Sequence, residues 1–349
     1  MRIRCFQTLE FRNYRTLSYT PSPRLNLLTG LNAQGKTNLL EALAVLITGR
    51  SFRTSRLADL PRWGAEAASL SGEVERTEGS RVVRRTIQRL EDGTWQAAGD
   101  GALWARVIVF GWHDLAILHG APAARRSFID GFAARLFPSH LPALLRYRRI
   151  VGRRNHLLQR RAPAELLAPW DEQLAEAGAE LISRRRRAVA ALQTELQRVY
   201  PALSGERHKI EIGYRSTIGE AVEAPALLEG LLRARAQELR RGLTLVGPHR
   251  DDLSIELDGI DARTFGSRGQ QRLLALALRL AEVLPVTEAV GTAPVLLLDD
   301  ALSELDPVAR ANVLLEIRSA EQVFLTSPDP LAVEGAARWV IEKGGIAAA

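Results

Sequence analysis

The feature that most constrains the fold is the segment 30–37, GLNAQGKT, which fits the phosphate-binding pattern G-x-x-x-x-G-K-[ST]. Residues 24–29 before it alternate as in a β-strand, and residues 38–47 after it have the composition of a helix. A strand, a glycine-rich loop and a helix in this order place the positive end of the helix against a phosphate. The segment therefore predicts an α/β fold with a nucleotide site at the end of a strand.

The residue types of the loop each predict a role. Glycine lets successive backbone N–H groups turn toward the phosphates. We expect the Lys36 ammonium to neutralise phosphate charge and the Thr37 hydroxyl to ligate Mg²⁺. We assign nucleotide binding to the whole loop and the residue after it: Gly30, Leu31, Asn32, Ala33, Gln34, Gly35, Lys36, Thr37 and Asn38.

An apolar run near the other end of the chain, residues 295–300, ends in Asp299 and Asp300. Apolar runs that end in Asp are common and often only cap a helix, but here Pro307 follows at a position typical of the first residue of a helix. In an open parallel sheet, ligands bind beyond the carboxyl ends of the strands, so we expect Thr29 and Asp299 to face one crevice. We assign Asp299 to the hydrated metal ion, and we expect Asp300 to orient or deprotonate the attacking water in phosphoryl transfer.

A third segment, residues 265–272 (FGSRGQQR), precedes an apolar helical pattern, and Ser267 is suited to cap that helix. Alone it indicates an ordinary capped helix. Together with the phosphate loop and the acidic strand, it resembles the signature of ABC-type ATPases. The resemblance implies an ABC-type P-loop ATPase head, with a mixed sheet, flanking helices and antiparallel strands. It also implies that Ser267, Gly269 and Gln270 contact the ATP of a second copy, in an ATP-dependent homodimer.

Within that superfamily the chain resembles the RecF family, bacterial proteins related to the SMC proteins. The segments that carry the resemblance run from end to end: 9–15 (LEFRNYR), 30–41, 51–56 (SFRTSR), 120–130, 246–253 (VGPHRDDL), 267–273 and 298–306. The resemblance implies that Arg12 and Asn13 contribute to nucleotide binding and that a short helical insertion, lobe II, replaces the long coiled coil of SMC proteins. It further implies weak, DNA-stimulated ATP hydrolysis, binding to double-stranded or gapped DNA, and help in loading RecA together with RecO and RecR.

The chain departs from its relatives at two places. Trp112 and His113 stand where SMC-type ATPases often carry a glutamine that senses the metal, so they either reshape the site or only pack there. Thr326 or Ser327 stands where many ABC ATPases carry a switch histidine, which we interpret as a family trait. The role of residues 249–252 is open between the nucleotide, the dimer interface and the fold.

Arginines gather in the middle of the chain, which has 349 residues and a formal net charge of +7. A solvated helix face is the usual reason for such runs. Few aromatic residues lie among them, which favours contacts with the backbone of duplex DNA over base stacking. The arginines concerned are Arg146, Arg148, Arg149, Arg153, Arg154, Arg160, Arg161 and the run 184–187.

Composition and patterning predict three parts: residues 1–122 with the phosphate loop, 123–240 as the helical, arginine-rich lobe II, and 241–349 with the signature and the acidic strand. Prolines are expected to punctuate the helices of the second part, and residues 344–349 are expected to be disordered.

The single cysteine, Cys5, excludes an internal disulfide, and no segment is apolar enough to span a bilayer, so we expect a cytoplasmic protein with no membrane partner. Two other classes of ATPase share these motifs. A transporter-type ABC subunit is disfavoured by the long segment between Thr37 and Ser267, and a structural SMC-like tether by the missing coiled coil.

Overall fold

The computed structural model describes residues 1–76, 78–100 and 106–349, with only the backbone of residue 265. The chain divides into two compact units, which are described separately. The first comprises Met1–Leu115, Val199–Arg207 and Arg268–Ala349, and the second Ala116–Arg198 and His208–Ser267. The predicted functional division at residues 122 and 240 stays a prediction.

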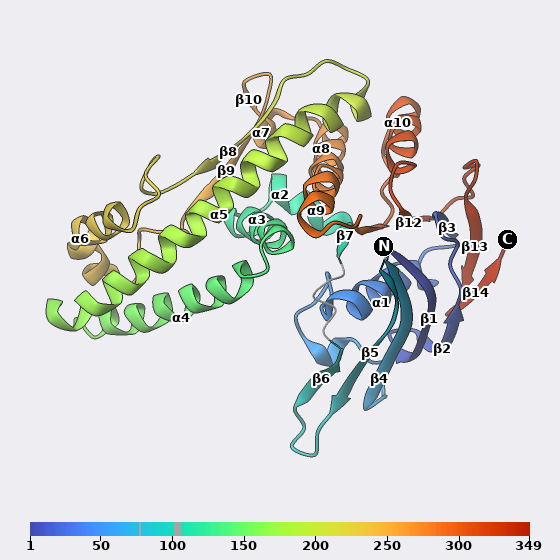
Figure 1. Ribbon diagram of the computed structural model, residues 1–349, viewed down its shortest axis with the longest axis horizontal. Helices are drawn as coiled ribbons and strands as arrows, with labels where there is room; N and C mark the ends of the chain where they lie inside the picture. The colour runs from blue at the N-terminus through green and yellow to red at the C-terminus, as the bar shows by residue number, and fades with distance from the viewer. Residues whose placement is uncertain (77, 101–105) are drawn as a thin grey trace. The chain divides into compact units, whose positions relative to one another are not determined.

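The first unit contains a six-stranded sheet in the order β14-β13-β3-β12-β11-β7 (Figure 1). Its strands are β3 (Leu25–Thr29), β7 (Val107–Phe110), β11 (Val295–Leu298), β12 (Gln322–Ser327), β13 (Ala337–Glu342) and β14 (Gly345–Ala348). Neighbouring strands are parallel except in the β13–β14 hairpin. Because β3 and β11 both pair with β12 in parallel, Thr29 and Leu298 end at the same edge of the sheet, as the two motifs predicted.

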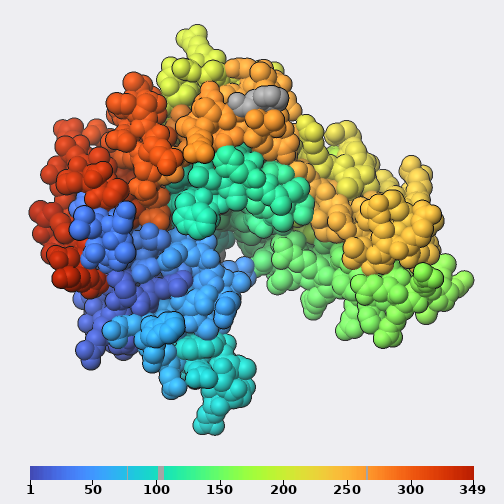
Figure 2. Space-filling view, turned by 180° about the vertical axis from the view of Figure 1, so that it is seen from behind, coloured from blue at the N-terminus to red at the C-terminus, as the bar shows by residue number. Residues whose placement is uncertain are grey.

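The expectation that residues 344–349 are disordered is wrong. Ala348 pairs with Trp339 and Gly345 pairs with Glu342, so β14 closes the edge of the sheet. Ile346 also packs against the core of this unit. Strand β14 contacts β2 (Tyr14–Tyr19), and Figure 2 shows the C-terminal segment in red beside the N-terminal segment in blue. Pairing with β13 and packing of Ile346 order this tail. Its residues are mostly small and do not alternate clearly between apolar and polar, so the sequence alone does not predict a strand here.

A second, five-stranded antiparallel sheet has the order β2-β1-β4-β5-β6. Its strands are β1 (Arg2–Phe11), β2 (Tyr14–Tyr19), β4 (Ala67–Arg76), β5 (Gly79–Arg89) and β6 (Trp95–Gly99). The buried residues of β1 are Ile3, Phe6, Thr8 and Phe11, and only Phe6 and Thr8 keep the period of two along a strand. The register of β1 with β4 shifts between Ile3 and Cys5, which interrupts the alternation. The antiparallel strands expected in the first part of the chain are therefore present.

Helix α1 (Lys36–Thr48) contacts strands of both sheets. Its residues from Leu39 to Ile47 are all buried, including Glu41. Burial on every side explains why this helix is apolar almost throughout, with no amphipathic stripe. Gly49 ends it in the left-handed conformation, with a φ of 71°. The phosphate loop is thereby anchored to the main core of the unit.

The remaining helices of the first unit are η1 (Leu57–Asp59), η2 (Trp112–Leu115), α8 (Arg268–Leu280), α9 (Val283–Val290) and α10 (Pro307–Ile317). The Asp306 carboxylate caps α10 by accepting hydrogen bonds from the backbone N–H groups of Val308 and Ala309, at 2.8 and 2.9 Å. Pro307 is the first residue of that helix, as predicted.

The second unit consists mainly of helices: α2 (Ala116–His119), α3 (Pro122–Leu136), α4 (His140–Gln159), α5 (Ala164–Ser204, whose last turn lies in the first unit), α6 (Ala224–Arg241) and α7 (Ala262–Phe265). A small sheet, β10-β9-β8, completes it, with β8 (Ile210–Arg215), β9 (Asp252–Leu257) and β10 (Ile260–Asp261). Leu144, Tyr147, Leu174 and Leu231 form the core between α4, α5 and α6.

The prediction that prolines punctuate the helices is wrong for Pro169 and Pro201, which lie inside α5. Each removes one backbone hydrogen bond, but both lie near an end of a 41-residue helix. Burial of Leu174, Leu181 and their neighbours over the length of α5 offsets these local losses. No helix in the described part of the chain is both long and apolar enough to cross a membrane.

Candidate nucleotide site

Residues 30–35 form a tight loop between β3 and α1, and Lys36 and Thr37 are the first residues of the helix. Gly35 has a φ of 121°, which favours glycine, and a Cβ there would lie 2.7 Å from Nδ2 of Asn13. The hydroxyl of Tyr14 donates a hydrogen bond of 2.9 Å to the Gly35 carbonyl. The strand–loop–helix arrangement predicted from the sequence is therefore confirmed, and the start of α1 faces the loop.

Lys36 folds its ammonium back over the loop. Its Nζ donates hydrogen bonds to the carbonyls of Gly30 and Leu31, the latter at 2.9 Å. Burial lowers the pKa of Lys36, while the nearby charges of Asp299 and Asp300 act in the opposite direction. A phosphate group would replace the two carbonyls as the partner of this cation.

The loop and the acidic strand meet directly. The Thr37 hydroxyl contacts Oδ1 and Oδ2 of Asp299 at 2.9 and 2.8 Å. The Thr326 hydroxyl donates to Oδ1 of Asp299 at 2.8 Å and accepts a hydrogen bond of 2.8 Å from the backbone N–H of Asp300. Thr37 at the start of α1 and Thr326 near the end of β12 thus contact the one carboxylate that directly follows β11.

The electrostatics of Asp299 suit a cation. Burial raises its pKa and the neighbouring Asp300 raises it further, while the hydroxyls of Thr37 and Thr326 lower it. A divalent cation would stabilise the charged form that burial disfavours. The Thr37 hydroxyl and the Asp299 carboxylate are hard oxygen donors, the kind that Mg²⁺ prefers, so these residues fit the ion.

A cavity of about 500 Å³ opens over these groups. Lys36, Thr37, Asp299 and Asp300 all line it, so the structure brings the predicted catalytic and metal residues together. The lining residues are Asn32, Ala33, Gly35, Lys36, Thr37, Asn38, Arg53, Trp112, Arg272, Asp299, Asp300, Thr326 and Pro328.

The predicted residues Arg12 and Asn13 lie beside the loop. The guanidinium of Arg12 binds the buried carboxylate of Glu41 in bidentate fashion, at 2.8 and 2.6 Å. Asn13 donates to the Gln34 carbonyl at 2.9 Å and accepts from the side chain of Asn38 at 2.8 Å. Asn13 thus holds the loop, and Arg12 holds the helix that follows it. The contact of either residue with a nucleotide stays a prediction.

Ser267, Gly269 and Gln270 are exposed at the start of α8. None is among the described residues that line the cavity of the phosphate loop. Exposure suits a segment that binds the nucleotide of a second copy, but their role in trans stays a prediction.

Sequence reasoning missed several residues of the site. Thr326 was noted only as a replacement for a histidine, yet it holds both acidic residues. Arg272 binds the hydroxyl of Ser303 at 2.6 Å and the carbonyl of Asp300. Arg53 binds Asn38 at 2.7 Å and Glu41 at 3.1 Å. The sequence did point to two of these residues, because Arg53 lies in segment 51–56 and Arg272 in segment 267–273, both of which carry the resemblance to the RecF family.

Trp112 and His113 take different roles. Trp112 is 72% exposed at the cavity. The His113 ring stacks on Phe52, with ring centroids 5.4 Å apart, and burial lowers the pKa of His113. His113 is therefore a packing residue beside the site, while Trp112 shapes its mouth.

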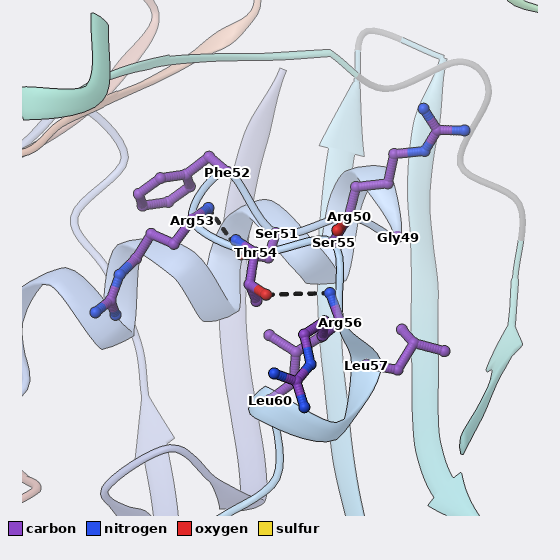
Figure 3. A pocket seen from close by; sticks show the side chains of 10 residues that line it. All are labelled: Gly49, Arg50, Ser51, Phe52, Arg53, Thr54, Ser55, Arg56, Leu57 and Leu60. Carbon is purple, nitrogen blue, oxygen red and sulfur yellow. Dashed lines mark hydrogen bonds between the residues drawn. The ribbon is translucent and has the colours of Figure 1, made fainter. Parts of the chain in front are cut away.

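A second cavity of about 500 Å³ follows α1 and is lined by residues 49–57 and Leu60. Figure 3 shows the side chains of Arg50, Arg53 and Arg56 pointing in different directions. Because the three guanidinium groups do not converge, this cavity lacks a preformed cradle for a small anion. Of the described lining residues, Arg53 alone is shared with the nucleotide cavity.

The arginine surface predicted in the second unit needs correction. Arg154 is fully buried and binds Asp171 at 2.7 Å and Glu238 at 2.6 Å. Arg185 is buried and binds both oxygens of Asp130, at 2.8 and 2.9 Å. These two cations are paired with carboxylates in the interior and cannot contact DNA.

Residues 249–252 make polar contacts within the second unit, where Asp251 is buried, His249 and Asp252 are partly buried and Arg250 is exposed. His249 bonds to the hydroxyl of Tyr147 at 2.7 Å, and the buried Asp251 accepts a hydrogen bond of 2.6 Å from Tyr214. Asp252 binds Arg125 at 2.6 and 2.9 Å. Of the roles left open for this segment, its contacts within the unit support the role in the fold.

Comparison with known proteins agrees with this geometry. A family model described as "AAA domain, putative AbiEii toxin, Type IV TA system" matches residues 25–334. The chain is 41% identical over 347 residues to the DNA replication and repair protein RecF of Symbiobacterium thermophilum, covering 94% of this chain and 92% of the relative. It is 37% identical over 344 residues to the protein of that name from Heliobacterium modesticaldum, with the same coverage of 94% and 92%.

Solved structures extend the comparison to the fold. A structure described as the recombination mediator protein RecF-ATP in the RecFOR pathway has a TM-score of 0.88 and 29% identity, covering 99% of both chains. The Smc head bound to the C-terminal winged-helix domain of ScpA has a TM-score of 0.58 at 15% identity, covering 100% of this chain and 97% of the other. The latter shows the fold alone, and the fold is that of an SMC-like ATPase head.

Proposed function

This chain belongs to the RecF family of DNA replication and repair proteins, and we propose that it binds ATP with Mg²⁺ and hydrolyses it slowly. The contact of the Thr37 hydroxyl with both carboxylate oxygens of Asp299, at 2.9 and 2.8 Å, carries the proposal. It joins a phosphate loop near the start of the chain to an acidic strand near its end. A phosphate-binding loop and a buried carboxylate at one point are what phosphoryl transfer requires.

In hydrolysis, a water oxygen bonds to the γ-phosphorus, the bond from that phosphorus to the bridging oxygen breaks, and the water loses a proton. Lys36 exchanges its loop carbonyls for phosphate oxygens, and Asp300 orients the water or accepts its proton. Thr37 and Asp299 would hold Mg²⁺, which would neutralise charge on the phosphates when bound. The Thr326 hydroxyl bonds to the side chain of Asp299 and to the backbone of Asp300, and so keeps both residues in position.

The proposal extends to DNA. Arginines along α4 and just beyond it are exposed, and among the described side chains they have no ion pair: Arg146, Arg148, Arg149, Arg153, Arg160 and Arg161. Free guanidinium groups bind phosphates without first breaking an internal pair. We therefore assign contacts with double-stranded or gapped DNA to this face of the second unit.

Two copies are proposed to join with ATP between them, with Ser267, Gly269 and Gln270 of one copy at the ATP of the other. The family likeness supports a cytoplasmic role with RecO and RecR in loading RecA, and it supports stimulation of hydrolysis by DNA. One solved relative is described with ATP and the RecFOR pathway, which favours the same assignment here.

The molecular mass in solution tests the proposal. Sedimentation with ATP and duplex DNA should show a dimer, and without ATP a monomer. Lys36→Ala should lose ATP binding and dimerisation, whereas Ser267→Arg should still bind ATP as a monomer. A Ser267→Arg protein that dimerises with ATP would refute the composite site, and a wild type that binds no ATP would refute the function.

DNA affinity as a function of salt tests the arginine face. Arg149→Glu should weaken duplex binding. The slope of log K against log salt should also become shallower, by an amount that corresponds to about one phosphate contact or more. Arg15→Glu, at a residue of the first unit whose side chain is 82% exposed, changes the charge equally and serves as the control. Equal losses in both variants would remove the assignment of DNA contact to α4.

A further inference from the structure

Gln34 in the phosphate loop is held by a turn at the other end of the chain. Its side-chain Oε1 accepts a hydrogen bond of 2.7 Å from the backbone N–H of Lys343. Its main-chain carbonyl accepts bonds from the N–H of Gly344 at 3.2 Å and from Nδ2 of Asn13 at 2.9 Å. Both oxygens of one loop residue are therefore fixed by neighbours outside the loop.

The turn between β13 and β14 has a shape that presents these donors. Lys343 has a φ of 48° and Gly344 a φ of 78°, as a two-residue hairpin turn of type I′ requires. Glu342 and Gly345 pair on either side of it. Two consecutive N–H groups of the turn, not used in the ladder, thereby point at the two oxygens of Gln34.

The hairpin packs tightly against Asn13 and the start of the phosphate loop. A Cβ on Gly344 would lie 2.8 Å from the carbonyl oxygen of Asn13, and a Cβ on Gly30 would lie 2.3 Å from that of Ile341. The Thr29 hydroxyl also donates to the carbonyl of Trp339 at 3.1 Å. The first residues of the loop and the hairpin thus touch backbone to backbone.

We propose that the turn at Lys343 and Gly344 is a positioning element for nucleotide binding, which sets the orientation of Gln34 within the phosphate loop. The inference rests on the proposed function, ATP binding at that loop. Backbone N–H groups bind phosphates only when each peptide of the loop points inward, so a small rotation at Gln34 misdirects the donors. The residues act through the loop and need no contact with ATP themselves.

The chain offers a matched control for the test. Asp258 and Gly259 form a turn with nearly the same angles, 53° and 78°. Among the described residues, no atom other than those of Gly259 and its two chain neighbours lies within 4 Å of a Cβ on Gly259. Gly344→Ala and Gly259→Ala therefore introduce the same backbone strain, but only Gly344→Ala pushes the turn away from the loop.

ATP affinity is measured by titration, with thermal unfolding as a check of the fold. Gly344→Ala should raise the Kd for ATP by roughly 10-fold, with kcat at saturating ATP little changed. Gly259→Ala should stay within about twofold of wild type, because its turn touches no site. A simple loss of stability would affect both variants alike and would not change Kd alone.

Gln34→Met, which keeps the length of the side chain and removes the acceptor of the Lys343 N–H, gives an independent test. It should also raise the Kd, and the double variant with Gly344→Ala should be no weaker than the weaker single variant, because both break one contact. If Gly344→Ala fails to fold, Gln34→Met decides. If wild type and Gly259→Ala bind no ATP, the proposed function fails and this inference with it. If they bind and Gln34→Met and any folded Gly344→Ala bind equally well, only this inference is overturned.

Discussion

The hydroxyl of Thr326 donates a hydrogen bond of 2.8 Å to Oδ1 of Asp299 and accepts one of 2.8 Å from the backbone N–H of Asp300. One side chain at the end of β12 thus holds both acidic residues at the end of β11. Burial raises the pKa of Asp299, and the hydrogen bond from Thr326 stabilises the charged form of its carboxylate. Loss of that bond therefore costs more free energy here than it would for a carboxylate at the surface.

Thr326→Val keeps the shape of the residue and removes the hydroxyl. We expect kcat for ATP hydrolysis to fall by roughly 10- to 100-fold, while the Kd for ATP changes by no more than about threefold, since the phosphate loop is untouched. Steady-state hydrolysis and nucleotide titration measure the two values. Thr326→Ser, which keeps the hydroxyl, is the control and should retain most activity. An unchanged kcat in Thr326→Val would show that this hydroxyl has no part in turnover.

Asp300→Asn should separate ATP binding from hydrolysis. The substitution keeps the size of the side chain but removes the carboxylate that orients or deprotonates the water, so turnover should fall by on the order of 100-fold or more. An ATP-bound dimer should then accumulate and be visible by sedimentation. Glu304→Gln removes the same charge from an exposed neighbour and should behave as wild type. Equal turnover in Asp300→Asn and wild type would contradict the role of Asp300.

The parts of the site that sequence predicted are those encoded locally. The glycines, Lys36 and Thr37 lie within one short pattern, and strand–loop–helix is the only context in which that pattern binds phosphate. Asp299 could be paired with them because parallel strands end at one edge of a sheet. The direct contact between Thr37 and Asp299 follows from these two rules.

The parts that sequence did not predict depend on partners distant in the chain. Glu41 lies in a helical pattern, and nothing in the local sequence indicates that Arg12 and Arg53 pair with it. Arg154 looked like part of a basic surface, yet Asp171 and Glu238 bury it. Ion pairs and edge strands such as β14 carry no local periodicity, so no pattern of spacing could reveal them.

Glu41 is expected to be a main support of the loop region. Its carboxylate is fully buried and binds Arg12, Arg53 and the hydroxyl of Ser51. Glu41→Ala leaves the cations without their partner, although both reach solvent in part, so we expect a loss of about 2–3 kcal/mol in the free energy of unfolding. Urea denaturation measures it.

The control for Glu41 is an exposed ion pair. Glu229 binds Arg233 with both side chains more than half exposed, at 66% and 71%. Glu229→Ala should change the free energy of unfolding by less than about 0.5 kcal/mol. Comparable losses in the two variants would mean that burial of Glu41 adds nothing to its pairing.

His249 should make the stability of the second unit depend on pH. Its Nε2 lies 3.0 Å from the carbonyl of Thr244, which can only accept, so Nε2 carries the proton and Nδ1 accepts from the hydroxyl of Tyr147. Protonation of Nδ1 would break that arrangement. Burial, the main cause, lowers the pKa of His249 to about 4.

The sign of the effect follows from the lowered pKa. The pKa of histidine in the unfolded chain is about 6.5. Between that pH and about 4, the unfolded chain therefore binds a proton at His249 that the folded chain does not bind. The contribution of His249 is complete above about pH 6.5 and is lost as the pH falls toward 4, by up to about 3 kcal/mol. His249→Gln, whose amide can both accept from Tyr147 and donate to Thr244, should lose less stability over this range in urea denaturation followed at several pH values. Parallel losses in wild type and His249→Gln between about pH 6.5 and 4 would contradict this role of His249, because the paired carboxylates Asp130 and Asp252, whose folded pKa values are lowered, lose their contribution only below about pH 4.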